Sequence, residues 1–423
     1  MLLRSDIERR MRMNYKNIFL IISTLISFNA YADSLDNQLQ NTIHQYLNKN
    51  KNKYHLSAVQ LSILLPNNNK PRDYVIGTQE FGKNKPATNH MLLQWGSITK
   101  EFTASLVFKL INEHKFKLTD NLEKILPEHF KKNARNPWPK AWGEINVAQL
   151  MNMTSGIPTY VDNNALIAMM QNKYFSMDDL VTIAKNKTLH CKVSEGCFYP
   201  SGKKWFYSNT NYIILGLIAE KYMGKPFSEL MQEFILNPFI KTNSNSAVYY
   251  STQKLPEVLL NNMVHGYIDN RSGSKVHFPK SWIDVTNDNL SLASSAGALF
   301  GNTNTMVRLI YALYHDKIIP PTSQLEQYQV EVPSGKIATN LKTQCDTHEG
   351  CFAMGVRMLF MPNQGGEIFY YQGGTLGYNA IYFWIPSENV VIGLSLPIAQ
   401  RGDWPLIQFA LKINTQIRRY LQN

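Results

Sequence analysis

Apolar and polar positions follow different periods at the two ends of the chain and in its middle. Apolar residues recur at every fourth position from Leu35 to Leu47, which predicts one face of an amphipathic helix. Apolar residues then alternate over 59–65, as in a strand with one buried face. Turn-forming residues fill 66–71 and lead into a second predicted strand over 73–81. These features predict a hairpin behind the first helix.

The middle of the chain, residues 96–315, is predicted to be mainly helical, with helices near 102–111, 213–222 and 306–314 separated by loops rich in Asn, Pro and Gly. The pattern then returns to strands at 367–371, 378–385 and 389–396, followed by an amphipathic helix over 405–421. The order of elements predicts an α+β chain.

The economical architecture for this order is an antiparallel sheet flanked by helices from both termini. We expect residues 33–95 and 326–423 to form this α/β domain, with a mainly helical domain, 96–325, inserted between the two parts. A cleft between two such lobes is a natural ligand site.

The first 32 residues have the pattern of a secretory signal peptide. Basic side chains precede an apolar run from Ile18 to Phe28, which ends at the small-x-small sequence Ala30-Tyr31-Ala32. We expect cleavage after Ala32 and an exported protein, periplasmic or secreted. An uncleaved membrane anchor is the alternative, although the run is short for a span.

Composition narrows the functional class only slightly. Apolar residues make up 44% and charged residues 17% of the 423 residues, an ordinary globular mixture. The formal net charge is +12, and about +9 remains once the predicted signal peptide is removed. A basic surface can bind anionic cell-wall polymers or make peripheral contact with anionic lipid, but ordinary soluble proteins can be basic as well. An exported chain with no nucleic-acid-binding motif is not expected to bind nucleic acid.

Four cysteines form two local pairs, Cys191 with Cys197 and Cys345 with Cys351. In an oxidising compartment an even count favours disulfides, and we expect these two local bonds among three connectivities. A zinc site is the alternative, although C-x5-C is not the usual ligand spacing.

Candidate chemistry begins with the pattern S-x-x-K, which occurs four times. Only Ser97-Ile98-Thr99-Lys100 opens a strong predicted helix, with Gly96 just before it. Residues three apart share a helix face, so Lys100 can reach Ser97, and a desolvated lysine can serve as base for a serine nucleophile. The simpler alternative is a helix-capping serine followed by a surface lysine.

Two further stretches carry polar groups suited to catalysis. Tyr207-Ser208-Asn209 precedes a predicted helix; a tyrosine near a lysine can act as general base, and an asparagine can orient lysine and substrate. The stretch 371–374 ends a strand, and its glycines would let a substrate backbone approach closely. Ordinary turns would explain both stretches as well.

Taken in order, these and neighbouring stretches resemble the serine β-lactamase and penicillin-binding-protein superfamily. The nearest branch holds class C β-lactamases, D-alanyl-D-alanine carboxypeptidases and related esterases. The resemblance covers most of the chain after the signal peptide and rests on 96–100, 117–120, 149–156, 200–212 with Gly224, 296–299 and 373–375.

The resemblance implies a β-lactamase/transpeptidase-like fold and a role for each matched residue. Ser97 would form an acyl-enzyme, Lys100 and Tyr207 would share the proton transfers, and Asn209 would orient Lys100 and substrate. The backbone N–H groups of Ser97 and Gly374 would form the oxyanion hole, and water or an amine would release the acyl group. No metal or organic cofactor is implied.

One departure affects the expected substrate. Relatives usually have Lys or His, then Thr or Ser, then Gly on this strand, where the present chain has Tyr371-Gln372-Gly373. The missing cation weakens recognition of a substrate carboxylate, while the phenol and amide could still bind a neutral ester or amide. A charged hydrogen bond is worth about 1.5–3 kcal/mol.

Three hypotheses follow. The first is a D-alanyl-D-alanine carboxypeptidase-like enzyme acting on a small-molecule or peptide substrate, with peptidoglycan-derived peptides among the candidates. The second is an esterase or a class C-like β-lactamase. The third is a catalytically silent cell-wall-binding protein of the same fold. The sequence does not indicate an oligomeric state.

Overall fold

The computed structural model describes residues 35–68, 70–190, 201–202, 204–269, 281–315, 318, 345, 350–398 and 404–422. The predicted signal peptide and the pair Cys191 and Cys197 therefore lie outside the described residues. In the described part of the chain, no helix is both long enough and apolar enough to cross a membrane.

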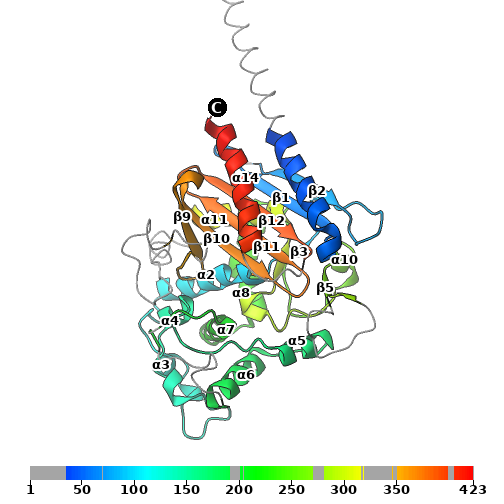
Figure 1. Cartoon of the computed structure of the whole chain (residues 1–423). Coiled ribbons are helices and arrows are strands. Elements are labelled where there is room, and N and C mark those ends of the chain that lie inside the picture. The colour runs from blue at the N-terminus through cyan, green and yellow to red at the C-terminus, as the bar shows by residue number, and fades with distance from the viewer. Residues whose placement is uncertain are drawn as a thin grey trace, which may run out of the picture.

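The main sheet combines strands from both ends of the chain (Figure 1). Within the described residues it has seven strands in the order β2-β1-β12-β11-β10-β9-β8, and each neighbouring pair is antiparallel. The strands are β1 (Ala58–Leu64), β2 (Arg72–Gly77), β8 (Cys351–Phe352), β9 (Arg357–Met361), β10 (Gly366–Gly374), β11 (Asn379–Ile385) and β12 (Val390–Leu396). The predicted α+β arrangement with an antiparallel sheet is confirmed.

Helices cover both faces of this sheet, which explains why β1 and β12 are buried along their whole length. On one face lie the helix at residues 35–54 and α14 (Trp404–Gln422), drawn in blue and red in Figure 1. Leu35, Leu39 and Ile43 belong to that core, together with Ile413 and Ile417. The four-residue period at the N-terminus thus marks the face of a helix that packs on the sheet.

The other face is covered by elements from the middle of the chain. Helix α11 (Thr303–Tyr314) packs on β1 and β12, so the predicted mainly helical region shares a core with the sheet. The same region also contains α2 (Thr99–Asn112), α3 (Leu122–Ile125), α4 (Val147–Met151), α5 (Asn163–Met170), α6 (Met177–His190), α7 (Asn209–Met223), α8 (Phe227–Met231), α9 (Asn237–Thr242) and α10 (Glu257–Leu260), and α2, α4, α6 and α8 pack around α7.

Short strands interrupt the region that was expected to be mainly helical. One small sheet has the order β3-β7-β4, formed by β3 (Leu93–Gln94), β4 (Val248–Tyr250) and β7 (Leu299–Gly301). The other pairs β5 (Tyr267–Asp269) with β6 (Trp282–Asp284). Strands of two or three residues are too short to show the alternation on which sequence-based prediction depends.

A buried carboxyl group anchors α2 to the elements around it. The Glu101 side chain is fully buried and accepts hydrogen bonds from Tyr314 of α11, at 2.5 Å, and from Tyr382 of β11. Burial raises the pKa of Glu101 to about 8, although both tyrosines favour the ionised form. These contacts fix the helix that begins immediately after Ser97.

Glu101→Gln should change how stability depends on pH. Because the folded-state pKa is about 8 and the ordinary value is 4.5, the folded protein holds a proton that the unfolded chain has lost between these values. The contribution of Glu101 to stability is therefore present below the lower pKa and declines as pH rises through this window, by up to about 1.4 kcal/mol per pH unit.

Thermal or urea unfolding between pH 5 and 8.5 measures this effect. The free energy of unfolding of the wild-type protein should fall relative to that of Glu101→Gln as pH rises. Glu113, at the end of the same helix, is 41% exposed in its ion pair with Lys109, so Glu113→Gln is the matched control and should leave the slope unchanged. Parallel curves for wild type and Glu101→Gln would contradict the account.

Candidate active site

Ser97 lies in the 3-10 turn η1 (Gly96–Ile98), which leads directly into α2. The flanking residues Gly96 and Ile98 are buried, while Ser97 is partly exposed and reaches a pocket. Gly96 has φ +54°, a left-handed conformation that glycine adopts without strain. The turn therefore presents the serine hydroxyl at the surface of an otherwise buried segment.

Two groups approach the Ser97 hydroxyl from different elements. Lys100 Nζ lies 2.9 Å from Ser97 Oγ, and the Tyr207 hydroxyl donates a hydrogen bond to the same oxygen, also at 2.9 Å. Ser97, Lys100 and Tyr207 were predicted as a catalytic group from the sequence, and the structure brings them together. The alternative of a capping serine beside a surface lysine is wrong, since Lys100 is fully buried.

The Lys100 ammonium makes two further hydrogen bonds. It donates to Asn209 Oδ1 and to the Ala296 carbonyl oxygen, each at 2.7 Å. An ammonium has three protons, so these two acceptors and Ser97 Oγ use all of them. Asn209 is thus placed where it can orient the lysine, as the sequence suggested, because it is the first residue of α7.

The lysine and the tyrosine alter each other's affinity for protons. Burial lowers the pKa of the Lys100 ammonium, and the nearby Tyr207 only partly opposes this effect. Burial alone would raise the pKa of Tyr207, but the charge of Lys100 and the hydrogen bonds around the phenol together outweigh burial and lower that pKa overall. Both groups therefore lose a proton more readily than usual, so either can serve as the base that takes the proton from Ser97.

The Ala296 carbonyl was not predicted to take part. It lies in the 3-10 turn η6 (Ser294–Ala296), within the stretch 296–299 that contributed to the family resemblance without a stated role. Every residue type carries the same backbone carbonyl, so only its place in that motif could have drawn attention to Ala296.

Met153 also has a supporting role that the sequence analysis did not assign. Its φ is +66°, its carbonyl oxygen accepts a hydrogen bond from Phe206 N at 2.9 Å, and its sulfur lies 3.5 Å from the backbone nitrogen of Ser208. Met153 therefore holds the chain on both sides of Tyr207.

Close packing of glycines forms the candidate oxyanion hole. A Cβ atom on Gly373 would lie 1.9 Å from the Trp95 carbonyl oxygen and 2.6 Å from Ser97 N, and one on Gly96 would lie 2.6 Å from Gly374 N. Only glycines allow the end of β10 to approach the serine turn this closely. Ser97 and Gly374 both line the same pocket, as the predicted oxyanion hole requires.

The residues predicted to contact substrate on this strand, Tyr371, Gln372 and Gly373, are all buried. Tyr371 is 1% exposed, Gln372 is buried, and the described pocket lining includes Gly374 and Thr375 but none of these three residues. The strand alternates, so Tyr371 joins the core shared with α2 while Tyr370 joins the opposite core. Tyr371 therefore belongs to the core in this structure, and its contact with substrate stays a prediction.

Tyr371 lies behind Tyr207 instead. Burial, followed by the neighbouring Tyr207, raises the pKa of Tyr371 well above its ordinary value, so its phenol stays neutral. The Phe352 ring packs edge-on against both tyrosines, with centroid distances of 6.5 Å to Tyr207 and 6.0 Å to Tyr371. Phe352 follows Cys351, which is joined to Cys345 by a disulfide. The disulfide therefore lies next in sequence to the ring that packs against Tyr207.

The Ser97 hydroxyl opens into a pocket of about 730 Å³, a size suited to a drug-sized ligand. Its lining is mostly apolar away from the serine, and the charged residues in the described lining are Lys53 and Asp269. The arrangement can support nucleophilic attack by Ser97 on a carbonyl, with a base beside it and two N–H donors.

Comparison with known proteins agrees with the fold and this site. The family model described as Beta-lactamase matches residues 51–398. Among curated proteins, the chain is 27% identical over 214 residues to Protein flp of Staphylococcus aureus strain N315, covering 50% of this chain and 39% of that protein. It is 24% identical over 256 residues to Penicillin-binding protein 4* of Bacillus subtilis strain 168, covering 59% of this chain and 50% of that protein. The chain thus spans half or less of these relatives' length.

A solved structure shows the same fold over nearly the whole chain. D-amino acid amidase from Ochrobactrum anthropi SV3, in complex with L-phenylalanine amide, superposes with a TM-score of 0.72 at 18% identity, covering 91% of this chain and 99% of the amidase. The predicted β-lactamase/transpeptidase-like fold is confirmed. The chain belongs to the beta-lactamase family, within the superfamily of serine β-lactamases and penicillin-binding proteins.

Proposed function

We propose that this protein is a hydrolase that forms an acyl-enzyme on Ser97 and acts on neutral amides or esters. The observation that carries the proposal is the position of Ser97 Oγ, 2.9 Å from both Lys100 Nζ and the Tyr207 hydroxyl, at the wall of a pocket of about 730 Å³. The similarity to a D-amino acid amidase supports an amide as substrate.

The reaction follows from the geometry. The Lys100 and Tyr207 pair accepts the hydroxyl proton as Ser97 Oγ bonds to the substrate carbonyl carbon. The developing oxyanion accepts hydrogen bonds from the N–H groups of Ser97 and Gly374. The bond to the leaving nitrogen or oxygen then breaks and that atom receives the proton. Water, deprotonated by the same pair, releases the acid and restores Ser97.

Substitution of Ser97 tests the nucleophile. Wild-type protein should be labelled by a fluorophosphonate and should hydrolyse short aryl esters, whereas Ser97→Ala should lose labelling and at least about a thousandfold in kcat/KM. Ser105, also on α2, donates to the Glu101 carbonyl oxygen away from the site, and Ser105→Ala should retain both properties. No labelling or turnover of the wild type would favour the silent binding protein.

A D-alanyl carboxypeptidase is the second candidate. It is favoured by Lys53, a cation in the pocket lining that could receive a substrate carboxylate. Against it stands Tyr371, a neutral and buried side chain where relatives carry Lys or His.

A pair of peptides separates the two candidates. The wild-type enzyme should cleave a D-Ala-terminated peptide no faster than the same peptide with its carboxylate amidated. Tyr371→His should raise the ratio of acid to amide hydrolysis by up to about tenfold, because an imidazolium beside Tyr207 adds a charged partner near the reacting group. Tyr371→Phe, which stays neutral, should not. Equal ratios in all three proteins would show that residue 371 does not limit carboxylate recognition.

We further propose that the protein acts outside the cytoplasm. The export pattern of residues 4–32 and the disulfide between Cys345 and Cys351 support this location. When the full chain is expressed in a Gram-negative host, the periplasmic protein should begin at Asp33 by N-terminal sequencing. Cytoplasmic protein that keeps residues 1–32 would contradict the proposal.

A further inference from the structure

One wall of the pocket is built by a single short segment. Residues 160–170 reach the lining through Tyr160, Val161, Asn163 and four apolar side chains of α5, namely Leu166, Ile167, Met169 and Met170. Leu290, Leu292 and three residues of β5 and β6, Ile268, Trp282 and Ile283, supply further apolar lining beside Asp269. The part of the pocket bordered by α5 therefore presents mainly apolar side chains and few groups that could pair with a charge on a ligand.

Helix α5 has a hollow on its other side as well. A second cavity, of about 660 Å³, is lined by Asn164, Ala165 and Ala168 of α5, and by Ile183 and Lys187 of α6. The eight residues of α5 thus form a partition between two hollows, although Ala165 and Met169 are buried in the main core. Contacts at the start of the helix add to this packing in fixing its position.

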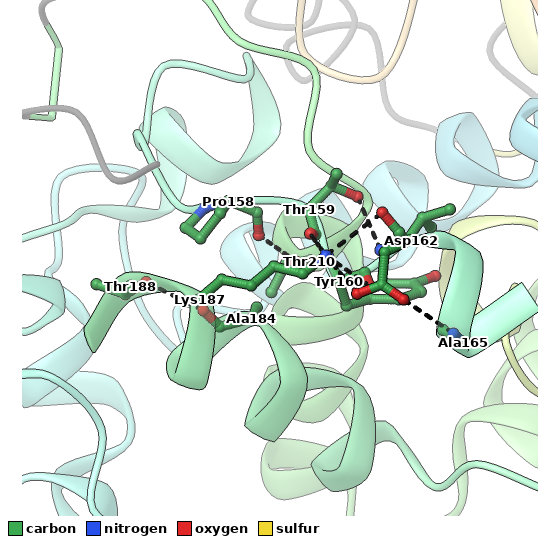
Figure 2. Close-up of polar contacts among 10 residues, drawn as sticks. Pro158, Thr159, Tyr160, Asp162, Ala165, Ala184, Lys187, Thr188 and Thr210 are labelled. Carbon is green, nitrogen blue, oxygen red and sulfur yellow. Dashed lines mark hydrogen bonds and ion pairs between the residues drawn. The ribbon is translucent and has the colours of Figure 1, made fainter. Parts of the chain in front are cut away.

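Lys187 fixes the N-terminal end of this partition (Figure 2). Its ammonium lies 2.9 Å from Thr159 O, 3.1 Å from Tyr160 O and 3.4 Å from Val161 O, and it forms an ion pair with Asp162 at 3.0 Å. Three successive carbonyl oxygens that converge on one place need a hydrogen-bond donor between them, and Lys187 supplies its ammonium from α6.

The same segment is tied to the catalytic elements and to α5. Asp162 caps α5 by accepting a hydrogen bond from Ala165 N at 2.8 Å. Tyr160 N donates to Thr210 Oγ1 at 3.1 Å, and Thr210 directly follows Asn209 on α7. The Tyr160 hydroxyl donates to Leu292 O, at 2.5 Å, on another part of the lining. Lys187 therefore contacts the start of the apolar wall, and Tyr160 links this segment through Thr210 to Asn209, which accepts a hydrogen bond from Lys100.

We propose that the pocket selects substrates with a bulky apolar acyl group, and that Lys187 is the positioning residue that holds its α5 wall in place. The inference rests on the proposed acyl-enzyme on Ser97. It names the substrate class of that site as neutral amides or esters of medium-length alkyl or aryl-alkyl acids.

A series of p-nitrophenyl esters with acyl chains from acetyl to decanoyl tests the substrate class. For the wild-type enzyme, kcat/KM should rise by up to about fourfold per added methylene until the pocket is filled, since each buried CH2 contributes about 0.8 kcal/mol. A profile that is flat or falls beyond acetyl, from an enzyme that still hydrolyses the acetyl ester, would overturn the substrate class while leaving the proposed function intact.

Substitution of Lys187 tests the wall. Lys187→Met should raise KM for the octanoyl ester about tenfold and leave KM for the acetyl ester and kcat for both within about threefold, because only long chains reach α5. Lys187→Arg, which keeps the charge, should recover most of the loss. Lys185 lies on the same helix and bonds Asn136 at 2.5 Å, so Lys185→Met is the matched control and should behave as wild type.

Two results would overturn the role of Lys187: equal losses on acetyl and octanoyl esters, or equal effects of Lys187→Met and Lys185→Met. Calorimetric binding of octanamide and acetamide to Ser97→Ala gives a readout independent of turnover. Octanamide should bind to Ser97→Ala at least tenfold more tightly than acetamide does. Adding Lys187→Met to the Ser97→Ala protein should remove most of this difference in affinity. If Ser97→Ala binds octanamide no more tightly than acetamide, the proposed selection of apolar acyl groups is wrong, even if Ser97 proves to be the nucleophile.

Discussion

The buried ammonium of Lys100 is the interaction on which the rest of the site depends. A fully buried cation is costly unless all its protons are bound, and here each has an oxygen acceptor on Ser97, Asn209 or Ala296. These acceptors belong to three separate elements: the turn before α2, the start of α7 and the turn η6. Satisfying one charge therefore brings together the parts of the chain that form the reactive centre.

The second constraint is the approach of the sheet to the serine turn. The Gly373-Gly374 end of β10 packs against residues 95–97 at distances that exclude any side chain. The sheet is held from both faces by helices, and α2 is tied to it by Glu101, so the two predicted N–H donors at Ser97 and Gly374 lie on rigid elements. Preorganised donors of this kind need no rearrangement when charge develops on a substrate oxygen.

The substrate pocket is fixed in position by different contacts from those around Ser97. The catalytic side chains are fixed by buried hydrogen bonds, whereas the α5 wall is a short helix between two hollows, positioned at one end by Lys187, whose side chain is 29% exposed. A rigid reactive centre beside a less firmly packed wall lets the shape of the substrate pocket change without disturbing Ser97. Such a division is consistent with one fold serving many substrates through changes in the segments around a fixed site.

The sequence by itself determined the helix at 35–54, helices α2, α7, α11 and α14, and strands β1, β2, β10, β11 and β12, because apolar periods of four and two residues report which face of an element is buried. It also placed Ser97 and Lys100 one helical turn apart and singled out Tyr207 and Asn209. The tertiary structure alone decided the contact of Lys100 with the Ala296 carbonyl, the burial of Tyr371 behind Tyr207 and the hold of Lys187 on residues 159–162. A backbone carbonyl is the same in every residue, and whether a strand residue meets substrate or core depends on partners far away along the chain. Local patterns record the period of an element, but they do not record which distant atoms complete its contacts.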